Sequence, residues 1–74
     1  MEKIEIPIQT DYIKLDQLLK FSGIAENGAD AKDMILDGIV AYNGDVCLQR
    51  GKKVRPGDVV QIVFEDETVQ ILVN

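Results

Sequence analysis

The sequence predicts an α+β domain in which two short helices pack against a small, mostly antiparallel sheet of about five strands. Three observations support this fold class. Apolar residues alternate with other residues near the N-terminus, recur at helical spacing over residues 15–37, and alternate again towards the C-terminus. The chain has 74 residues, of which 46% are hydrophobic, so it is long enough for one domain with a thin core. We therefore treat residues 1–74 as a single domain.

The first strand is expected around Ile4, Ile6 and Ile8, which occupy every second position. Pro7 has no backbone N–H to donate to a neighbouring strand. This strand should therefore lie at an edge of the sheet.

Two helices should follow. Three leucines between residues 15 and 19 recur at helical spacing, and Gly23 is a suitable terminator for this first helix. Asn27 is a good N-cap for the second helix, and Gly38 is a good residue to follow its last turn. The helices are short and closely connected, so they should pack as a pair. We expect Phe21 to pack in the core.

The remainder should form short strands. Asn43-Gly44 between two apolar runs predicts a two-residue hairpin with Tyr42 opposite Asp45. Both faces of this hairpin are apolar, so we expect both to be covered. Arg55–Asp58 reads as a tight turn, and two alternating strands follow it, joined by Glu65–Glu67.

The composition argues against an enzyme. The chain has no His and a single cysteine, Cys47, which excludes an internal disulfide, a zinc site and a nucleophile paired with His. We expect no cofactor and no metal. No run approaches the length of a membrane span, and the N-terminus lacks a signal peptide. We therefore expect a complete cytoplasmic protein that does not contact membranes.

A compact basic segment is the strongest functional signal. Residues 50–57 carry four of the eight basic side chains and no acid, in a chain of net charge −5. Such a local concentration of cations attracts phosphate backbones. Gly51 and Gly57 would allow a ligand to approach the backbone closely. A solvated loop between strands is the alternative interpretation.

Five short motifs follow one another along the chain, at Lys14–Lys20, Ala31-Lys32, Gly38–Gly44, Arg50–Val54 and Gly57–Val60. This ordered set resembles the RNA-binding domain named after small-subunit ribosomal protein S-four, in its stand-alone bacterial form. The resemblance spans a motif core at residues 14–60, and it implies the fold known as the alpha-L RNA-binding motif.

The resemblance implies that the two helices and the basic segment form one face on structured RNA, such as ribosomal or transfer RNA, without catalysis. We expect a monomer that acts within a ribonucleoprotein. Many members carry Ser-Arg at the head of the second helix, where this chain has Asn27-Gly28 and so lacks that cation. The RNA-binding residues implied by position are Lys14, Lys20, Lys32, Arg50, Gly51, Lys52, Lys53 and Arg55.

Two other interpretations remain open from the residues alone. The lysines of the helices could simply form the polar sides of amphipathic helices. The whole protein could instead be a protein-interaction module that docks through its acidic surface and its strand edges. Phe21 and Tyr12 are candidates for stacking on bases, as aromatic side chains do in many RNA-binding proteins, with core packing the favoured role for Phe21.

Overall fold

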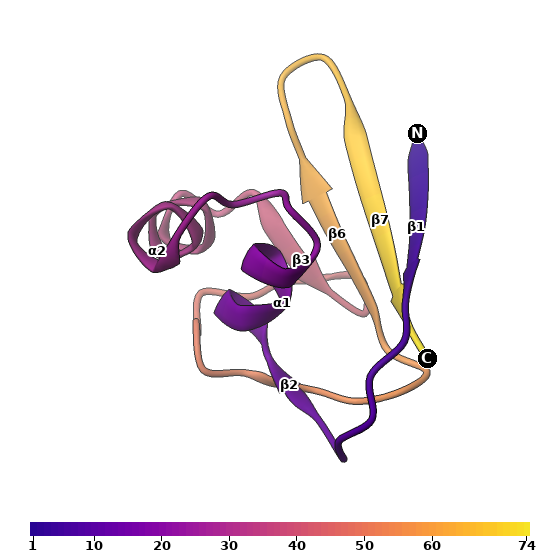
Figure 1. Ribbon diagram of the computed structural model, residues 1–74. Coiled ribbons are helices and arrows are strands. Elements are labelled where there is room, and N and C mark those ends of the chain that lie inside the picture. The colour runs from indigo at the N-terminus through magenta and orange to yellow at the C-terminus, as the bar shows by residue number, and fades with distance from the viewer.

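A computed structural model describes residues 1–74 and shows two helices on one side of a twisted sheet (Figure 1). Neither helix has the length or the apolar character needed to cross a bilayer. In chain order the elements are β1 (Glu2–Ile6), β2 (Ile13–Lys14), α1 (Leu15–Phe21), α2 (Gly28–Leu36), β3 (Val40–Tyr42), β4 (Asp45–Val46), β5 (Lys53–Val54), β6 (Val59–Val63) and β7 (Thr68–Val73).

The main sheet has five strands in the order β1-β7-β6-β3-β4, and all its pairs are antiparallel except β1 with β7. The expected fold class is therefore confirmed, and β1 lies at an edge as Pro7 predicted. A second sheet pairs β2 with β5 over two residues each. These two strands are too short to produce a periodic pattern, which is why the sequence did not predict them.

The core lies between the helices and one face of the sheet. Leu15, Leu18 and Leu19 of α1 are fully buried, as is Ile35 of α2. They belong to one apolar cluster with alternate residues of the central strands, because successive side chains of a strand point to opposite faces. The strand residues of this cluster are Val40, Val54, Val60, Ile62, Ile71 and Val73.

Two expectations about burial are wrong, the first because the opposite face of the sheet carries no helix. Val46 pairs with Ala41 in register and is 63% exposed, so the hairpin is not covered on both faces. Phe21 is 67% exposed instead of packing in the core. At 100° per residue it falls on the flank of α1 with Gln17, away from the buried leucines.

The ends of α2 and the turns form as their residues predict. The Asn27 Oδ1 atom accepts a hydrogen bond from the Asp30 N–H at 2.8 Å, and Gly38 adopts a φ of 78° after the last turn. Asn43 and Gly44 both have positive φ, with Tyr42 opposite Asp45. Local sequence is sufficient at these positions because each depends on one side chain or one backbone conformation.

Replacing Asn27 with Ala should lower the free energy of unfolding by about 1 kcal/mol, because one N–H at the start of α2 loses its acceptor. Urea denaturation followed by circular dichroism measures this. The matched control is Glu26→Ala, since that exposed side chain makes no hydrogen bond and its loss should change stability by less than about 0.5 kcal/mol. Equal effects of the two changes would contradict the capping role.

Candidate nucleic-acid interface

Residues 50–55, here called the basic loop, lie against the start of α1. The Leu15 N–H donates to the Lys52 carbonyl at 2.9 Å, and the Asp16 N–H donates to the Arg50 carbonyl at 3.0 Å. Helix α1 has no side-chain N-cap, so these carbonyls satisfy two of its first N–H groups. The basic loop is therefore attached to α1 by its backbone, and its side chains remain available.

The β2–β5 pair places cations of two distant segments side by side. Lys14 lies directly opposite Lys53, and Ile13 lies opposite Val54. Val54 is fully buried, so the alternation of side chains directs Lys14 and Lys53 outward together. Like charges directly opposite each other destabilise a strand pair. An anion bound between the two ammonium groups would relieve this repulsion.

The lysines of the basic loop contact tyrosine rings. The Lys52 Nζ atom lies 4.8 Å from the centre of the Tyr42 ring, and the Lys53 Nζ atom lies 5.0 Å from that of Tyr12. Cation–π attraction holds an ammonium group near a ring face without using its N–H donors. No lysine or arginine side chain donates any of the side-chain hydrogen bonds in the structure. The N–H groups of these lysines and arginines are therefore free to donate hydrogen bonds to a phosphate.

Asp58 fixes the other end of the basic loop. Its carboxylate accepts hydrogen bonds from the Tyr42 hydroxyl at 2.6 Å, the Arg55 N–H at 2.8 Å and the Asn43 side-chain amide at 3.1 Å. Gly57, with a φ of 96°, allows the tight turn that brings Asp58 back towards Arg55. The loop is thereby tied to the β3–β4 hairpin. Sequence reasoning missed this role of Asp58, although a carboxylate directly after a Pro-Gly turn is a recognisable signal.

The hydrogen bonds around Asp58 shift the pKa values of two side chains, Asp58 and Tyr42. Burial opposes ionisation of Asp58, but the hydrogen bonds from Tyr42, Arg55 and Asn43, with the charge of Arg55, outweigh burial and lower the pKa of its carboxyl. The hydrogen bond to Asp58 raises the pKa of the Tyr42 hydroxyl, and burial and the negative charge of Asp58 add to this. At neutral pH the network therefore holds a carboxylate and a neutral phenol.

The structure brings together some of the predicted site residues and separates others. Lys14, Arg50, Lys52 and Lys53 meet at the contact between α1 and the basic loop. Arg55 stands at the turn that Asp58 closes. Gly51 has open space around it and no left-handed φ, so its conformation does not require glycine.

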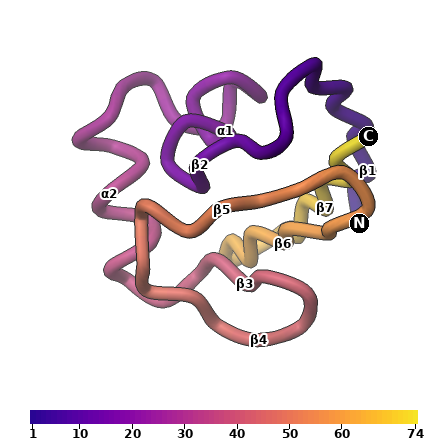
Figure 2. Tube along the Cα trace, turned by 90° about the horizontal axis from the view of Figure 1, so that it is seen from below, coloured from indigo at the N-terminus to yellow at the C-terminus, as the bar shows by residue number.

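The two remaining lysines lie elsewhere on the helices. Lys20 is exposed in the last turn of α1, at the opposite end from the basic loop. Lys32 is exposed on α2, between Ala31 and Asp33. Figure 2 shows β5 running beside β2 and across from the β3–β4 hairpin. Because β2 ends directly before α1, the basic loop lies near the start of α1.

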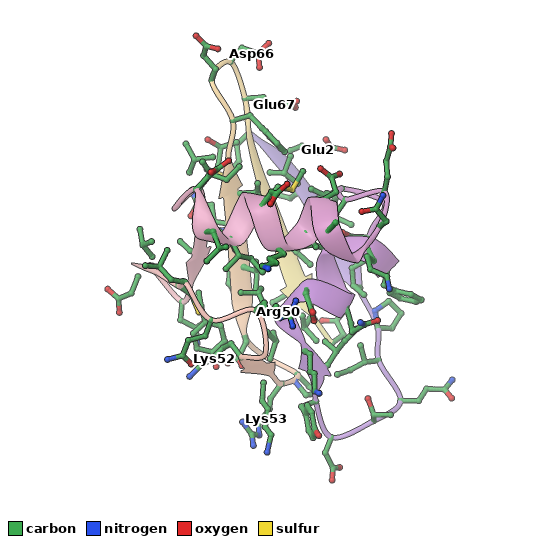
Figure 3. The ribbon with its side chains drawn as sticks, turned by 90° about the vertical axis from the view of Figure 1, so that its left-hand side faces the viewer. Glu2, Arg50, Lys52, Lys53, Asp66 and Glu67 are labelled. Carbon is green, nitrogen blue, oxygen red and sulfur yellow. The ribbon has the colours of Figure 1, made fainter.

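Part of the charge is separated along the molecule. Arg50, Lys52 and Lys53 lie in one half, and Asp66 and Glu67 lie at the far end of the other, on the β6–β7 hairpin (Figure 3). Glu2 at the start of β1 lies near the acidic end, since it pairs in register with Val69 of β7. These three acids therefore lie away from the basic loop, whereas Asp16, Asp45 and Asp58 lie beside it.

Comparison with known proteins gives consistent results. The S4 domain family, the S-four type described above, matches residues 6–72. A probable ribosome maturation protein of Bacillus subtilis, RlbA, is 37% identical over 57 residues, which cover 77% of this chain and 80% of RlbA.

A solved structure resembles the whole chain. The solution structure of YbcJ from E. coli, described as revealing an alfaL motif involved in RNA binding, superposes with a TM-score of 0.60 and 29% identity. The match covers 97% of this chain and 87% of YbcJ. The fold expected from the resemblance is therefore confirmed.

Replacing Asp58 with Asn should lower the free energy of unfolding at pH 7 by on the order of 1–2 kcal/mol, because a neutral amide accepts weaker hydrogen bonds at this partly exposed site. The pKa of Asp58 is lower in the folded state than its ordinary value of about 3.9. The stabilising contribution of the carboxylate is therefore complete above that ordinary value and is lost as the pH falls through the folded-state pKa.

Urea denaturation of both proteins over a pH series measures this effect, and the difference between them should shrink in acid. Asp45→Asn is the matched control, since Asp45 is an exposed acid of the hairpin that Asp58 contacts and makes no side-chain hydrogen bond. A D58N difference that stays constant with pH would show that the carboxylate charge is not responsible.

Proposed function

This chain belongs to the S4 domain family, and we propose that it is a non-catalytic module that binds structured RNA through phosphate-backbone contacts. The basic loop and Lys14 form the centre of the proposed interface. Lys20 and Lys32 extend it along the helices. The partner is ribosomal or transfer-like RNA in the cytoplasm, bound by a monomer within a ribonucleoprotein.

The juxtaposition of Lys14 and Lys53 is the observation that carries the proposal. These residues are 39 positions apart in sequence and directly opposite in the β2–β5 pair. Holding two ammonium groups together costs free energy in the unbound protein, and a bound phosphate offsets that cost. The backbone hydrogen bonds from α1 keep Arg50 and Lys52 beside them. A cluster of cations fixed by the backbone is well suited to a phosphate backbone.

Recognition should depend on the shape of the RNA. The central contacts are ammonium and guanidinium groups, which attract phosphates of any sequence. Double-helical RNA is met mainly through its phosphates and 2′-hydroxyls. The description of YbcJ, which names RNA binding, and that of RlbA, which names ribosome maturation, support an RNA partner for this chain.

The segregation of charge supports one binding orientation. RNA approaching the acidic β6–β7 hairpin meets repulsion from Asp66 and Glu67, and RNA approaching the basic loop meets attraction. The chain has no His and a single free cysteine, which favours binding without catalysis. We therefore propose binding alone.

Affinity for a paired RNA hairpin should fall steeply with salt. Four to six phosphate contacts predict a slope of log K against log salt of roughly −3 to −5, because each contact releases a condensed counterion. Fluorescence anisotropy with a labelled hairpin between 50 and 200 mM salt gives the slope. A slope near zero would show that the cations do not touch phosphates.

Reversing both lysines, as K52E/K53E, should weaken binding by roughly 100-fold, because two charge-assisted contacts are lost. The fold should survive, since the loop is held by its backbone carbonyls. Circular dichroism checks this. Lys53→Glu compared with Lys3→Glu on β1 provides a single-site control, because both changes alter the net charge equally.

Two results would contradict the proposal. Unchanged affinity of K52E/K53E would remove the basic loop from the interface, and equal losses for K53E and K3E would mean that only net charge matters. Capture of partners from lysate that survives nuclease treatment, together with absent binding to RNA, would favour the protein-interaction alternative.

A further inference from the structure

A groove of about 540 Å³ opens between the β3–β4 hairpin and the basic loop. Small-molecule sites in proteins have volumes of this order. The groove is shallow and largely open to solvent, and Lys52 of the basic loop forms part of its lining. The lining residues that matter for the argument are Tyr42, Asp45, Val46, Leu48, Gln49 and Lys52.

Two exposed apolar side chains line the groove beside polar ones. Val46 is 63% exposed and Leu48 is 57% exposed, and they are separated only by Cys47, which also lines the groove. An exposed apolar cluster bordered by charged residues indicates a contact surface. Tyr42 adds an aromatic ring whose position is fixed by its hydrogen bond to Asp58.

Lys52 connects the groove to the basic loop. Its side chain lines the groove with its Nζ atom 4.8 Å from the centre of the Tyr42 ring, while its carbonyl accepts from the first residue of α1. A molecule in the groove therefore lies beside the cations proposed to hold the RNA backbone. This continuity favours an occupant that is part of the same RNA.

The lining matches the parts of one nucleotide. Val46 and Leu48 can contact the flat apolar face of a base, and Lys52 can bind its phosphate. Asp45 and Gln49 are polar groups in the same wall, and a carboxylate accepts hydrogen bonds from an exocyclic amine of a base. A base stacked within a helix cannot enter such a groove, so the nucleotide must be unpaired.

We propose that this groove receives one unpaired nucleobase of the RNA whose backbone lies on the basic loop. The inference rests on the proposed RNA-binding function and specifies the class of RNA. The target is a helix interrupted by a bulged or looped nucleotide, with a base that carries an exocyclic amine. The phosphate contacts supply affinity for any paired RNA, and the groove supplies the preference for the unpaired site.

The test uses two RNA hairpins that differ only in one bulged adenosine, measured by fluorescence anisotropy at one salt concentration. The wild-type protein should bind the bulged hairpin roughly tenfold more tightly, the lower part of the range for contacts to one base. Leu48→Ala should remove most of this preference and leave affinity for the paired hairpin unchanged. Leu36→Ala is the matched control, because Leu36 is also 57% exposed but lies on α2.

Methyl NMR of this 8.2 kDa protein locates the base. The bulged hairpin should shift the methyl signals of Val46 and Leu48 far more than the paired hairpin does. Shifts confined to residues outside the groove would overturn the proposal.

The outcomes separate this inference from the proposed function. If both hairpins bind equally and K53E weakens both, the phosphate interface stands and the groove proposal is wrong. If neither hairpin binds, the proposed function fails and the groove proposal fails with it. If L48A and L36A reduce the preference equally, the effect is not specific to the groove and the proposal is overturned.

Discussion

The two hydrogen bonds from the first N–H groups of α1 to the carbonyls of Arg50 and Lys52 are the constraint on which the candidate interface depends. The first turn of a helix always has N–H groups without partners inside the helix, and here carbonyls 34 and 37 residues further along the chain accept from two of them. The helix start and the basic loop are therefore held together by backbone atoms. Because no basic side chain is needed for this attachment, the cations can serve a ligand.

The basic loop is restrained at both of its ends. Asp58 joins the turn at Arg55 to Tyr42 and Asn43 of the hairpin, and the β2–β5 pair holds Lys53 opposite Lys14. Ligand contacts made by a restrained loop lose less conformational entropy on binding than contacts made by a mobile one. Tyr42 takes part twice, since its hydroxyl binds Asp58 and its ring lines the groove beside Lys52. The structure thus links the cations of the basic loop with the groove proposed for an unpaired base.

Net charge alone gives a misleading view of this protein. A chain with net charge −5 would be expected to avoid nucleic acid, but its acids and bases are unevenly distributed. Salt screens the electrostatic effect of an exposed charge over about 8–10 Å at ordinary ionic strength. The charges close to the basic loop therefore matter more for binding than the net charge of the chain. The acidic β6–β7 hairpin lies at the far end of the molecule, where it can limit nonspecific binding and not oppose the interface.

The sequence by itself determined the features that depend on neighbouring residues. Four features can be read from the chain: the α+β class, the cap at Asn27, the hairpin turn at Asn43 and the concentration of cations in residues 50–57. Each reflects local periodicity, one backbone conformation or the composition of a short segment. Burial was less predictable. Phe21 and Val46 were expected to be covered, but a pattern cannot tell which of two apolar faces receives a partner.

Only the tertiary structure decided which distant residues meet. The pairing of Lys14 with Lys53 joins residues 39 positions apart, and the hydrogen bonds from Tyr42 and Asn43 to Asp58 span 16 and 15 positions. Two-residue strands carry no periodic signal, and the acceptor of a helix N–H can be any carbonyl that the fold brings near. Packing of the whole chain therefore had to select these contacts.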